Sequence, residues 1–422
     1  MTGWRRLTSP RPYRLLTSVA AGALLVSGCG VLPGGPGDSR EPVTVMTWAP
    51  DTTGADTVNM AGMPAMARTY ARWINEKGGI DGHELRVLTC NEQDTAAGAS
   101  KCARRAADED VAAVVGSYSR YGRAFLAPLE AAGIPYIGGY GASADEFTSY
   151  LSYPVNGGQP ALVAGNGEQL AASCERVSLV RPDTLVGDSM PGLLDTSLSR
   201  SDRPASYDIS AAEEATSYAS EASKALAQAG DGCVTAVLGK GTETFFDSFR
   251  RLEPEGSEVR ISSVLGSVGQ GLIDRSGGAD SPFEGALVTG WYPASGDARW
   301  REMRDVITEY AFGDDRIDPE DTGVQTTWIA YTALKAVVEA MDRSDITAGG
   351  ISVSLNRGTE VDTGGLTPVL RWRFQDMVGT AAYGRIVNGR VTFQVVRDGR
   401  LTAAKKGFVD VTDTLVNARS GG

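Results

Sequence analysis

Two kinds of apolar pattern alternate along most of the chain. Residues 43–48 form a β-branched apolar run that is typical of a buried strand, and apolar residues at helical spacing follow between Met60 and Ile74. The same order continues with strand-like and helix-like runs at residues 84–89, 94–108, 111–115, 124–132 and 135–137. Strands that alternate with helices predict a parallel sheet covered by helices on both faces.

A second series of the same kind begins near residue 160. Residues 162–172 have helical spacing, residues 177–180 resemble a strand, and residues 211–229 predict a long helix. The other runs of this series are helices at 193–198 and 244–252 and strands at 234–238, 259–265 and 286–291. The chain therefore predicts a second α/β half.

The alternation breaks down in the last third of the chain. Residues 299–312 predict an amphipathic helix, and residues 326–341 predict a strongly apolar one. Residues 370–410 are rich in strand-like runs and contain the turn signals Asn388-Gly389 and Asp398-Gly399.

The N-terminus has the pattern of an export signal. Four arginines precede an apolar run at residues 15–26, which is too short to span a bilayer. Cys29 directly follows Val-Ser-Gly, and this arrangement resembles the lipobox of bacterial lipoproteins. The resemblance implies a signal peptide at residues 1–28, a lipidated Cys29 and a Gly/Pro-rich linker at 29–42. A plain signal with a chance cysteine is the alternative.

Size and charge limit the remaining possibilities. Roughly 390 residues follow the signal, which suits two domains better than one core. The formal net charge of −12 argues against a nucleic-acid partner, because no basic surface is available to hold phosphates.

An even number of cysteines follows Cys29, as expected for disulfides in an exported chain. We pair Cys90 with Cys102, which closes a short loop. We pair Cys174 with Cys233, because both precede predicted strands whose starts lie side by side if the strands are parallel neighbours.

Residues 73–82, WINEKGGIDG, resemble a signature of the branched-chain amino acid–binding family of solute-binding proteins. The resemblance continues, in order, through residues 90–94, 110–116, 131–137, 146–148 and 330–334. It implies a type I periplasmic-binding-protein fold, in which two doubly wound parallel-sheet lobes are joined by a three-strand hinge. Lobe 1 would comprise residues 43–155 and 295–375, and lobe 2 residues 156–294 and 376–415.

The resemblance also implies what the chain does. It predicts a lipid-anchored, extracytoplasmic and monomeric protein that needs no cofactor. This protein would trap a small polar ligand, an amino acid or a related compound, and deliver it to the permease of an ABC importer. Two alternatives are a sensor that presents its closed state to a membrane receptor and a scaffold with a degenerate cleft.

Ligand contacts are expected at the carboxyl ends of the strands. The family has a serine at the start of the helix after its third strand, which favours Ser119 here, with Tyr118 beside it; a simple helix cap is the alternative. Tyr140 and Ser143 match the positions after the fourth strand, where a flexible surface turn is the alternative. Tyr331 matches a tyrosine of the late helix, or else a buried core residue.

Further candidates follow other strands. Trp48, after the first strand, faces the same mouth together with Asp51. Lys240 follows a lobe 2 strand and is either a ligand contact or a solvated lysine, and Trp291 lies near the hinge. Residues 263–267 lack the carboxylate with which amino-acid binders hold the ligand ammonium, so amino-acid specificity stays open.

Enzyme chemistry has little support in the sequence. The chain has one histidine, His83, at the start of a strand and therefore opposite the expected cleft. The segment Gly187-Asp188-Ser189-Met190-Pro191 lacks the final glycine of a nucleophile elbow. No phosphate-binding loop or metal-ligand motif is present. We therefore predict a binding protein without catalytic residues, metal or cofactor.

Overall fold

The computed structural model describes residues 40–418, except 53–57, 255, 342–344 and 381. The predicted signal peptide, Cys29 and nearly all of the linker lie outside the described residues. Among the described helices, none has the length and apolar character needed to cross a membrane.

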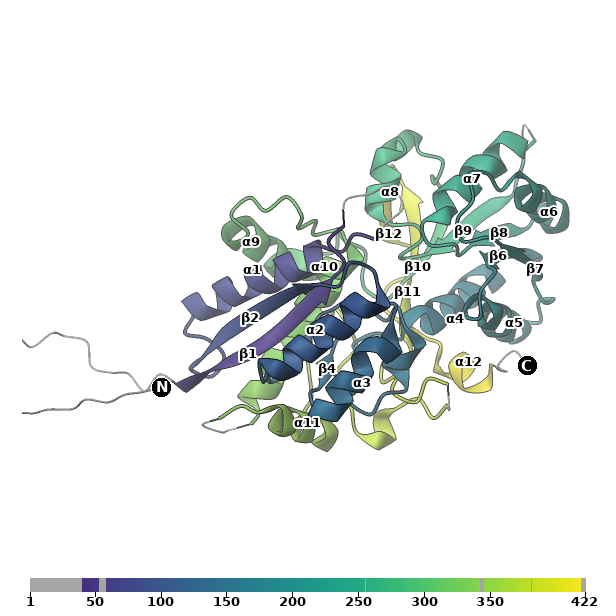
Figure 1. Cartoon of the computed structure of the whole chain (residues 1–422). Coiled ribbons are helices and arrows are strands. Elements are labelled where there is room, and N and C mark those ends of the chain that lie inside the picture. Colours follow the sequence, from purple (N-terminus) through teal and green to yellow (C-terminus); the bar gives the residue numbers. More distant parts are fainter. Residues whose placement is uncertain (1–39, 53–57, 255, 342–344, 381, 419–422) are drawn as a thin grey trace, which may run out of the picture. The chain divides into compact units, whose positions relative to one another are not determined.

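Lobe 1 is built on a parallel sheet, sheet A, with the strand order β2-β1-β3-β4-β5 (Figure 1). Side chains alternate across it: Val45 of β1 packs toward α1 and α10, whereas Met46 and Trp48 pack toward α2 and α3. The elements that precede the first crossing are β1 (Arg40–Ala49), α1 (Gly62–Glu76), β2 (His83–Asn91), α2 (Ala96–Asp108), β3 (Ala113–Val115), α3 (Gly122–Ala132), β4 (Tyr136–Ile137) and β5 (Ser152–Tyr153).

Lobe 2 is built on a mixed sheet, sheet B, with the order β12-β11-β10-β9-β8-β6-β7 and β13 paired to β11. Strands β6 to β10 are parallel, and β11 runs antiparallel to β10. Leu179 packs toward α4 and α5, and its neighbour Val180 packs toward α6, α7 and α8. The elements are α4 (Gly158–Ala171), β6 (Val177–Pro182), α5 (Met190–Ser199), β7 (Tyr207–Ala211), α6 (Ala219–Ala229), β8 (Cys233–Ala236), α7 (Gly241–Leu252), β9 (Arg260–Val264), α8 (Gln270–Arg275) and β10 (Leu287–Gly290).

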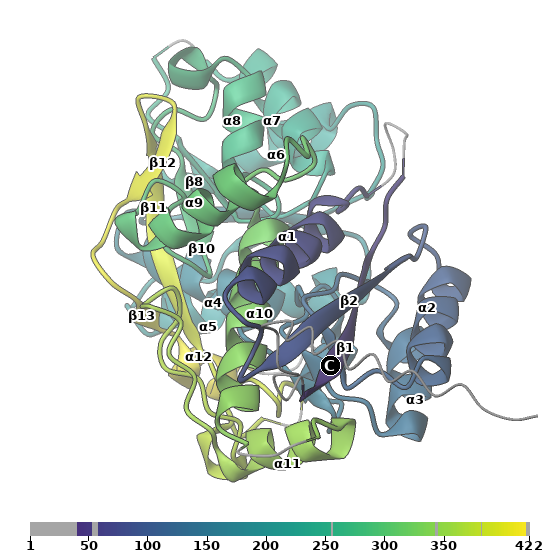
Figure 2. The ribbon, with the colours of Figure 1, turned by 90° about the vertical axis from the view of Figure 1, so that its left-hand side faces the viewer.

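The chain then returns to lobe 1 and comes back to lobe 2. The helices α9 (Arg301–Tyr310), α10 (Thr322–Glu339) and α11 (Ala348–Arg357) join lobe 1, where α10 packs on α1 (Figure 2). The last elements, β11 (Arg390–Arg397), β12 (Arg400–Ala403), β13 (Val409–Asp410) and α12 (Thr412–Asn417), join lobe 2. Three crossings thus connect the lobes, and the predicted fold class is confirmed.

The crossings are tied to one another by side chains. The Asn156 amide nitrogen donates to the Tyr292 hydroxyl at 3.0 Å, and the Trp291 indole donates to the Gly158 carbonyl at 2.9 Å. Asn388 of the third crossing donates to the Val155 carbonyl at 3.2 Å. All three connecting segments are therefore held side by side.

Both disulfides form as predicted. The Cα atoms lie 5.7 Å apart in Cys90–Cys102 and 5.9 Å apart in Cys174–Cys233. The reason for the second pair is the predicted one, since β6 and β8 are parallel neighbours and Val177 is in register with Cys233.

One predicted element is wrong in its first part. The helix predicted at 211–229 begins at Ala219, and the residues just before Ala212 form β7. In that strand Ile209 and Ala211 are buried while Asp208 and Ser210 are exposed, the two-residue period of a sheet edge. Residues 212–218 thus form a loop at the carboxyl end of β7.

Candidate ligand-binding site

A cavity of about 420 Å³ lies between the lobes at the carboxyl ends of strands from both sheets. This volume is within the range of small-molecule sites. The carboxyl ends of parallel strands are also where open α/β sheets bind ligands. Lobe 1 contributes Val58, Asn59, Met60, Tyr118, Arg120, Tyr140, Gly141 and Ala142, and the rest is lined by Gln159, Leu162, Glu213, Glu214, Leu238, Gly239, Lys240, Val264, Leu265, Gly266, Ser267 and Trp291.

Three aromatic rings form one wall of this cavity. The ring centroids of Tyr118 and Tyr140 lie 5.2 Å apart, and Tyr140 meets Trp291 edge to face at 5.3 Å. Burial raises the pKa of both tyrosines above the ordinary value, so both phenols are neutral at physiological pH. The wall therefore offers apolar ring surface together with neutral hydroxyl groups.

The backbone of the two lobe 1 loops is shaped for this wall. The Tyr140 N–H donates to the Ser117 carbonyl at 3.0 Å, which joins the loop after β4 to the loop after β3. Gly138 has φ = 61°, and a Cβ there would lie 2.4 Å from the Cβ of Ala330 on α10. Only glycine fits this turn without displacing the helix.

Charged groups of both signs surround the rings. Arg120 of lobe 1 makes a two-point contact with Asp94, at 2.9 and 2.7 Å. Lys240 precedes α7, and Glu213 and Glu214 follow β7. The cavity can thus meet a ligand cation with carboxylates of lobe 2 and a ligand anion with Arg120 or Lys240.

Two of the six predicted ligand-binding residues, Tyr118 and Tyr140, line the cavity. Trp48, Ser119, Ser143 and Tyr331 are buried and are not among the lining residues. The Ser119 hydroxyl accepts the Tyr121 N–H at 3.1 Å, and the Tyr331 hydroxyl lies 2.8 Å from that of Thr47.

The other two of these buried residues also have internal partners. The Ser143 hydroxyl accepts the Asp145 N–H at 3.2 Å, and Trp48 packs against Phe125 and Tyr136. These interactions hold the loops behind the aromatic wall, and a direct ligand contact by these four residues stays a prediction.

Two buried carboxyl groups lie behind the lobe 1 loops. Glu146 accepts the N–H groups of Gly141 and Ser143 at 3.2 and 3.0 Å. Burial nevertheless raises its pKa to about 8, because desolvation outweighs those hydrogen bonds. Burial also raises the pKa of Glu92 to about 7, although the Ser119 side chain favours the ionised form.

Sequence reasoning missed the carboxylates of lobe 2. A carboxylate was expected at residues 263–267, where the sequence has none. Glu213 and Glu214 instead reach the cavity from the loop after β7. The wrong helix at 211–229 concealed them, because it placed both residues inside a regular element. The two-residue period of Tyr207–Ala211 was the available signal.

The side chains considered for catalysis, His83 and Ser189, do not line the cavity. The single histidine, His83, is buried and its Nδ1 is 2.6 Å from the Glu41 carbonyl. The Ser189 hydroxyl donates to the Val186 carbonyl at 2.8 Å. Within the described part of the chain, no group of three or more His, Cys, Asp or Glu side chains could hold a metal ion.

The family model described as periplasmic binding protein matches residues 47–401, which is most of the chain. The chain belongs to this family. The binding protein is therefore an extracytoplasmic, non-enzymatic ligand-binding protein, and the predicted family resemblance is confirmed. No curated protein matches the sequence.

Solved structures have the same fold as this binding protein. An extracellular ligand-binding receptor from Verminephrobacter eiseniae is 17% identical with a TM-score of 0.69, covering 85% of this chain and 99% of that one. A branched chain amino acid ABC transporter from Thermus thermophilus with bound valine is 15% identical with a TM-score of 0.68, covering 89% and 99%. A leucine binding protein from Thermotoga maritima is 16% identical with a TM-score of 0.65, covering 88% and 99%.

Proposed function

We propose that this binding protein is anchored to the outer face of the cell membrane and delivers a small polar ligand to an ABC importer. Hinge closure would enclose the ligand between the lobes, and the closed form would dock on the permease. The observation that carries the proposal is the cavity itself, because both lobes line it at the carboxyl ends of their strands.

The lining residues support an amino acid or a related compound with an apolar or aromatic side group. Glu213 and Glu214 suit an ammonium group, and Arg120 and Lys240 suit a carboxylate. Tyr118, Tyr140 and Trp291 would cover the apolar part. The sequence analysis did not find these lobe 2 carboxylates, and their presence supports an amino acid as the ligand.

The anchor rests on Cys29 and on the export signal before it. The two disulfides of the folded part are consistent with an oxidising compartment. Acyl chains on Cys29 would hold the protein at the membrane, and the Gly/Pro-rich linker would separate the lobes from it. With Cys29→Ala, we expect release of the protein from the membrane fraction of its native cell.

Ligand capture is tested by thermal-shift screening against amino acids, amides, ureas and small peptides, followed by calorimetry on the compound that raises the melting temperature most. Tyr140→Ala should weaken the binding of that compound at least tenfold, since it removes the central ring of the wall. The matched control is Tyr150→Ala, because Tyr150 is 61% exposed and does not line the cavity. Equal affinity in both variants, or no stabilising compound, would contradict the proposal.

A further inference from the structure

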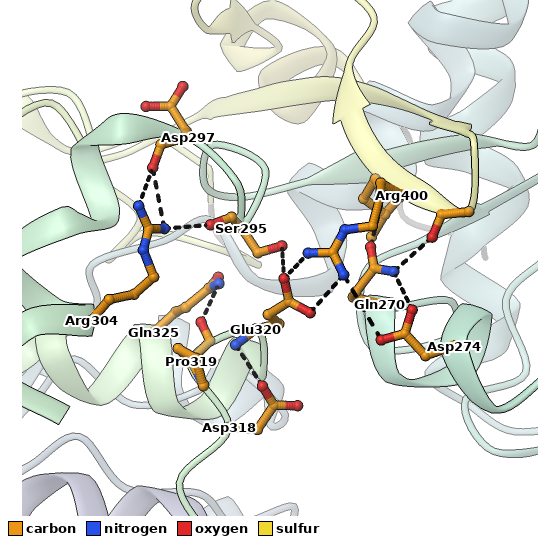
Figure 3. Close-up of polar contacts among 12 residues, drawn as sticks. Gln270, Asp274, Ser295, Asp297, Arg304, Asp318, Pro319, Glu320, Gln325 and Arg400 are labelled. Carbon is orange, nitrogen blue, oxygen red and sulfur yellow. Dashed lines mark hydrogen bonds and ion pairs between the residues drawn. The ribbon is translucent and has the colours of Figure 1, made fainter. Parts of the chain in front are cut away.

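An ion pair connects the two lobes (Figure 3). Arg400 on β12 of lobe 2 donates through both terminal nitrogens to Glu320, which lies on the lobe 1 segment between α9 and α10. One of these contacts, from Nη1 to Oε2, measures 3.2 Å. The residues are 80 positions apart in sequence, so the pair joins separate parts of the chain.

Arg400 is held in place by lobe 2. The Gln270 side chain at the start of α8 donates to the Gly399 carbonyl at 2.8 Å and accepts the Leu401 N–H at 2.9 Å. It therefore fixes the backbone on both sides of Arg400. Asp274 lies 3.9 Å from the guanidinium group and is itself hydrogen-bonded to Gln270 at 2.7 Å.

Glu320 is held in place at the edge of lobe 1. Its N–H donates to the Asp318 carboxylate at 2.8 Å, and its own carboxylate accepts the Ser295 hydroxyl at 3.1 Å. Asp321, the next residue, caps α10 by accepting the Val324 N–H at 3.0 Å. Because both ends are positioned in advance, the pair loses less side-chain entropy than a flexible surface pair does.

The pair borders the ligand site. A second cavity of about 270 Å³ has Glu320 in its wall and shares Met60, Tyr140, Lys240 and Gly266 with the main cavity. The two lobes must separate along this flank if the cleft opens. The ion pair would then break, whereas the contacts that position each partner within its own lobe would remain.

We propose that Arg400 and Glu320 form an interlobe latch, which closes one flank of the ligand cavity and keeps part of the population closed before a ligand binds. This inference rests on the proposed hinge closure, but it requires neither an identified ligand nor transport. The latch is ionic and the Arg400 side chain is 48% exposed, so added salt weakens it. Weakening it raises the open fraction, and the ligand must then supply more of the closing free energy.

The test is hydrogen–deuterium exchange of the full chain in mild detergent without ligand, in 0.05 M and 0.5 M salt. Exchange is read in cleft loops that contain neither residue of the pair, namely residues 117–121, 139–143 and 238–241. Glu320→Gln should speed this exchange by about two- to five-fold in low salt. High salt should remove most of the difference between the variant and the unmodified protein.

Two comparisons separate a latch from a local effect. Glu320→Gln combined with Arg400→Gln should exchange no faster than either single variant, because each change removes the same pair. Asp376→Asn is the matched control, since it breaks a two-point pair, at 2.7 and 2.9 Å, with Arg373, which is three residues away in the same segment, so this pair does not join the lobes. Asp376 is as exposed as Glu320, at 23%, and its loss should leave the cleft loops unchanged.

The outcomes are distinguishable. Faster exchange confined to residues 318–322 and 399–401 would overturn the latch, as would additive effects of the two substitutions. If no ligand is ever found but the cleft loops respond as expected, the latch stands and the proposed transport role fails. If a ligand binds and the cleft loops do not respond, the latch fails and the proposed function stands.

Discussion

The two walls of the cavity are held in place by different means. In lobe 1 the loops after β3 and β4 rest on buried polar groups, among them Ser117, Tyr136 and Glu146. In lobe 2 the loops after β7 and β8 place exposed charged residues, Glu213 and Lys240, at the cavity. This difference suggests a division of labour in which lobe 1 presents a fixed aromatic surface and lobe 2 brings charges to the ligand as the cleft closes.

Removing each disulfide tests whether the two lobes also differ in how much a covalent cross-link stabilises them. Cys174→Ser with Cys233→Ser opens a connection of 59 residues in lobe 2, and Cys90→Ser with Cys102→Ser one of 12 residues in lobe 1. Chain entropy predicts losses in the free energy of unfolding of about 4 and about 3 kcal/mol, respectively. Urea unfolding measures both, and a larger loss for the lobe 1 pair would contradict the expected order.

The buried carboxyl of lobe 1 predicts a pH dependence. Because the pKa of Glu146 is raised to about 8 in the folded state, its contribution to stability is complete below about 4.5 and is lost as the pH rises through 8. Glu146→Gln does not titrate but loses one of the two acceptors that face Gly141 and Ser143. The variant should therefore be less stable than the unmodified protein at pH 5 and gain on it by roughly 2–4 kcal/mol toward pH 9.

Urea unfolding at a series of pH values measures this difference. Glu130→Gln is a useful control. Glu130 is another lobe 1 carboxyl, which accepts the Ser149 hydroxyl at 2.6 Å, but it is only part-buried. A constant difference between Glu146→Gln and the unmodified protein at all pH values would mean that Glu146 does not titrate in this range.

The fold was predictable because its signals are local and periodic. The apolar runs that became β1 and α1, and the strand starts next to Cys174 and Cys233, needed no knowledge of long-range contacts. The three-strand hinge came only with the family resemblance, and the strand order of sheet A was not predicted. The one wrong element, residues 211–218, is rich in Ala and Glu, which favour a helix, but in the structure β7 ends at Ala211 and residues 212–218 form a loop.

The site was less predictable for a physical reason. Counting residues from a motif finds the loop, but it does not determine which side chain of that loop faces the cavity. Tyr118 and Ser119 are adjacent, yet Tyr118 lines the cavity and the hydroxyl of Ser119 turns inward to the Tyr121 N–H. Such a choice depends on which neighbours satisfy each buried polar group, and the sequence alone does not contain those neighbours.

The charges of lobe 2 should affect binding without affecting folding. Glu213→Gln with Glu214→Gln should weaken the binding of an amine-bearing ligand about tenfold, because a cation then loses its charged partners. Both residues are exposed, so the melting temperature without ligand should change little. Glu175→Gln is the control, an exposed lobe 2 carboxyl outside the cavity lining. Calorimetry with the compound found by screening measures the effect, and unchanged affinity would remove the carboxylates from the site.

The smallest effect is expected at Arg120, the one charged residue that the described part of lobe 1 gives to the cavity. Asp94→Asn removes the two-point partner of Arg120, whose side chain is 48% exposed, so the loss of stability should stay below about 1 kcal/mol. The effect on ligand affinity depends on whether the lobe 1 wall is fixed or rearranges when the ligand binds. If lobe 1 is a fixed surface, Arg120 needs Asp94 to keep its position, and affinity for a carboxylate-bearing ligand should fall about two- to five-fold. If affinity rises instead, Asp94 was competing with the ligand for Arg120, and lobe 1, like lobe 2, offers charges that rearrange on binding.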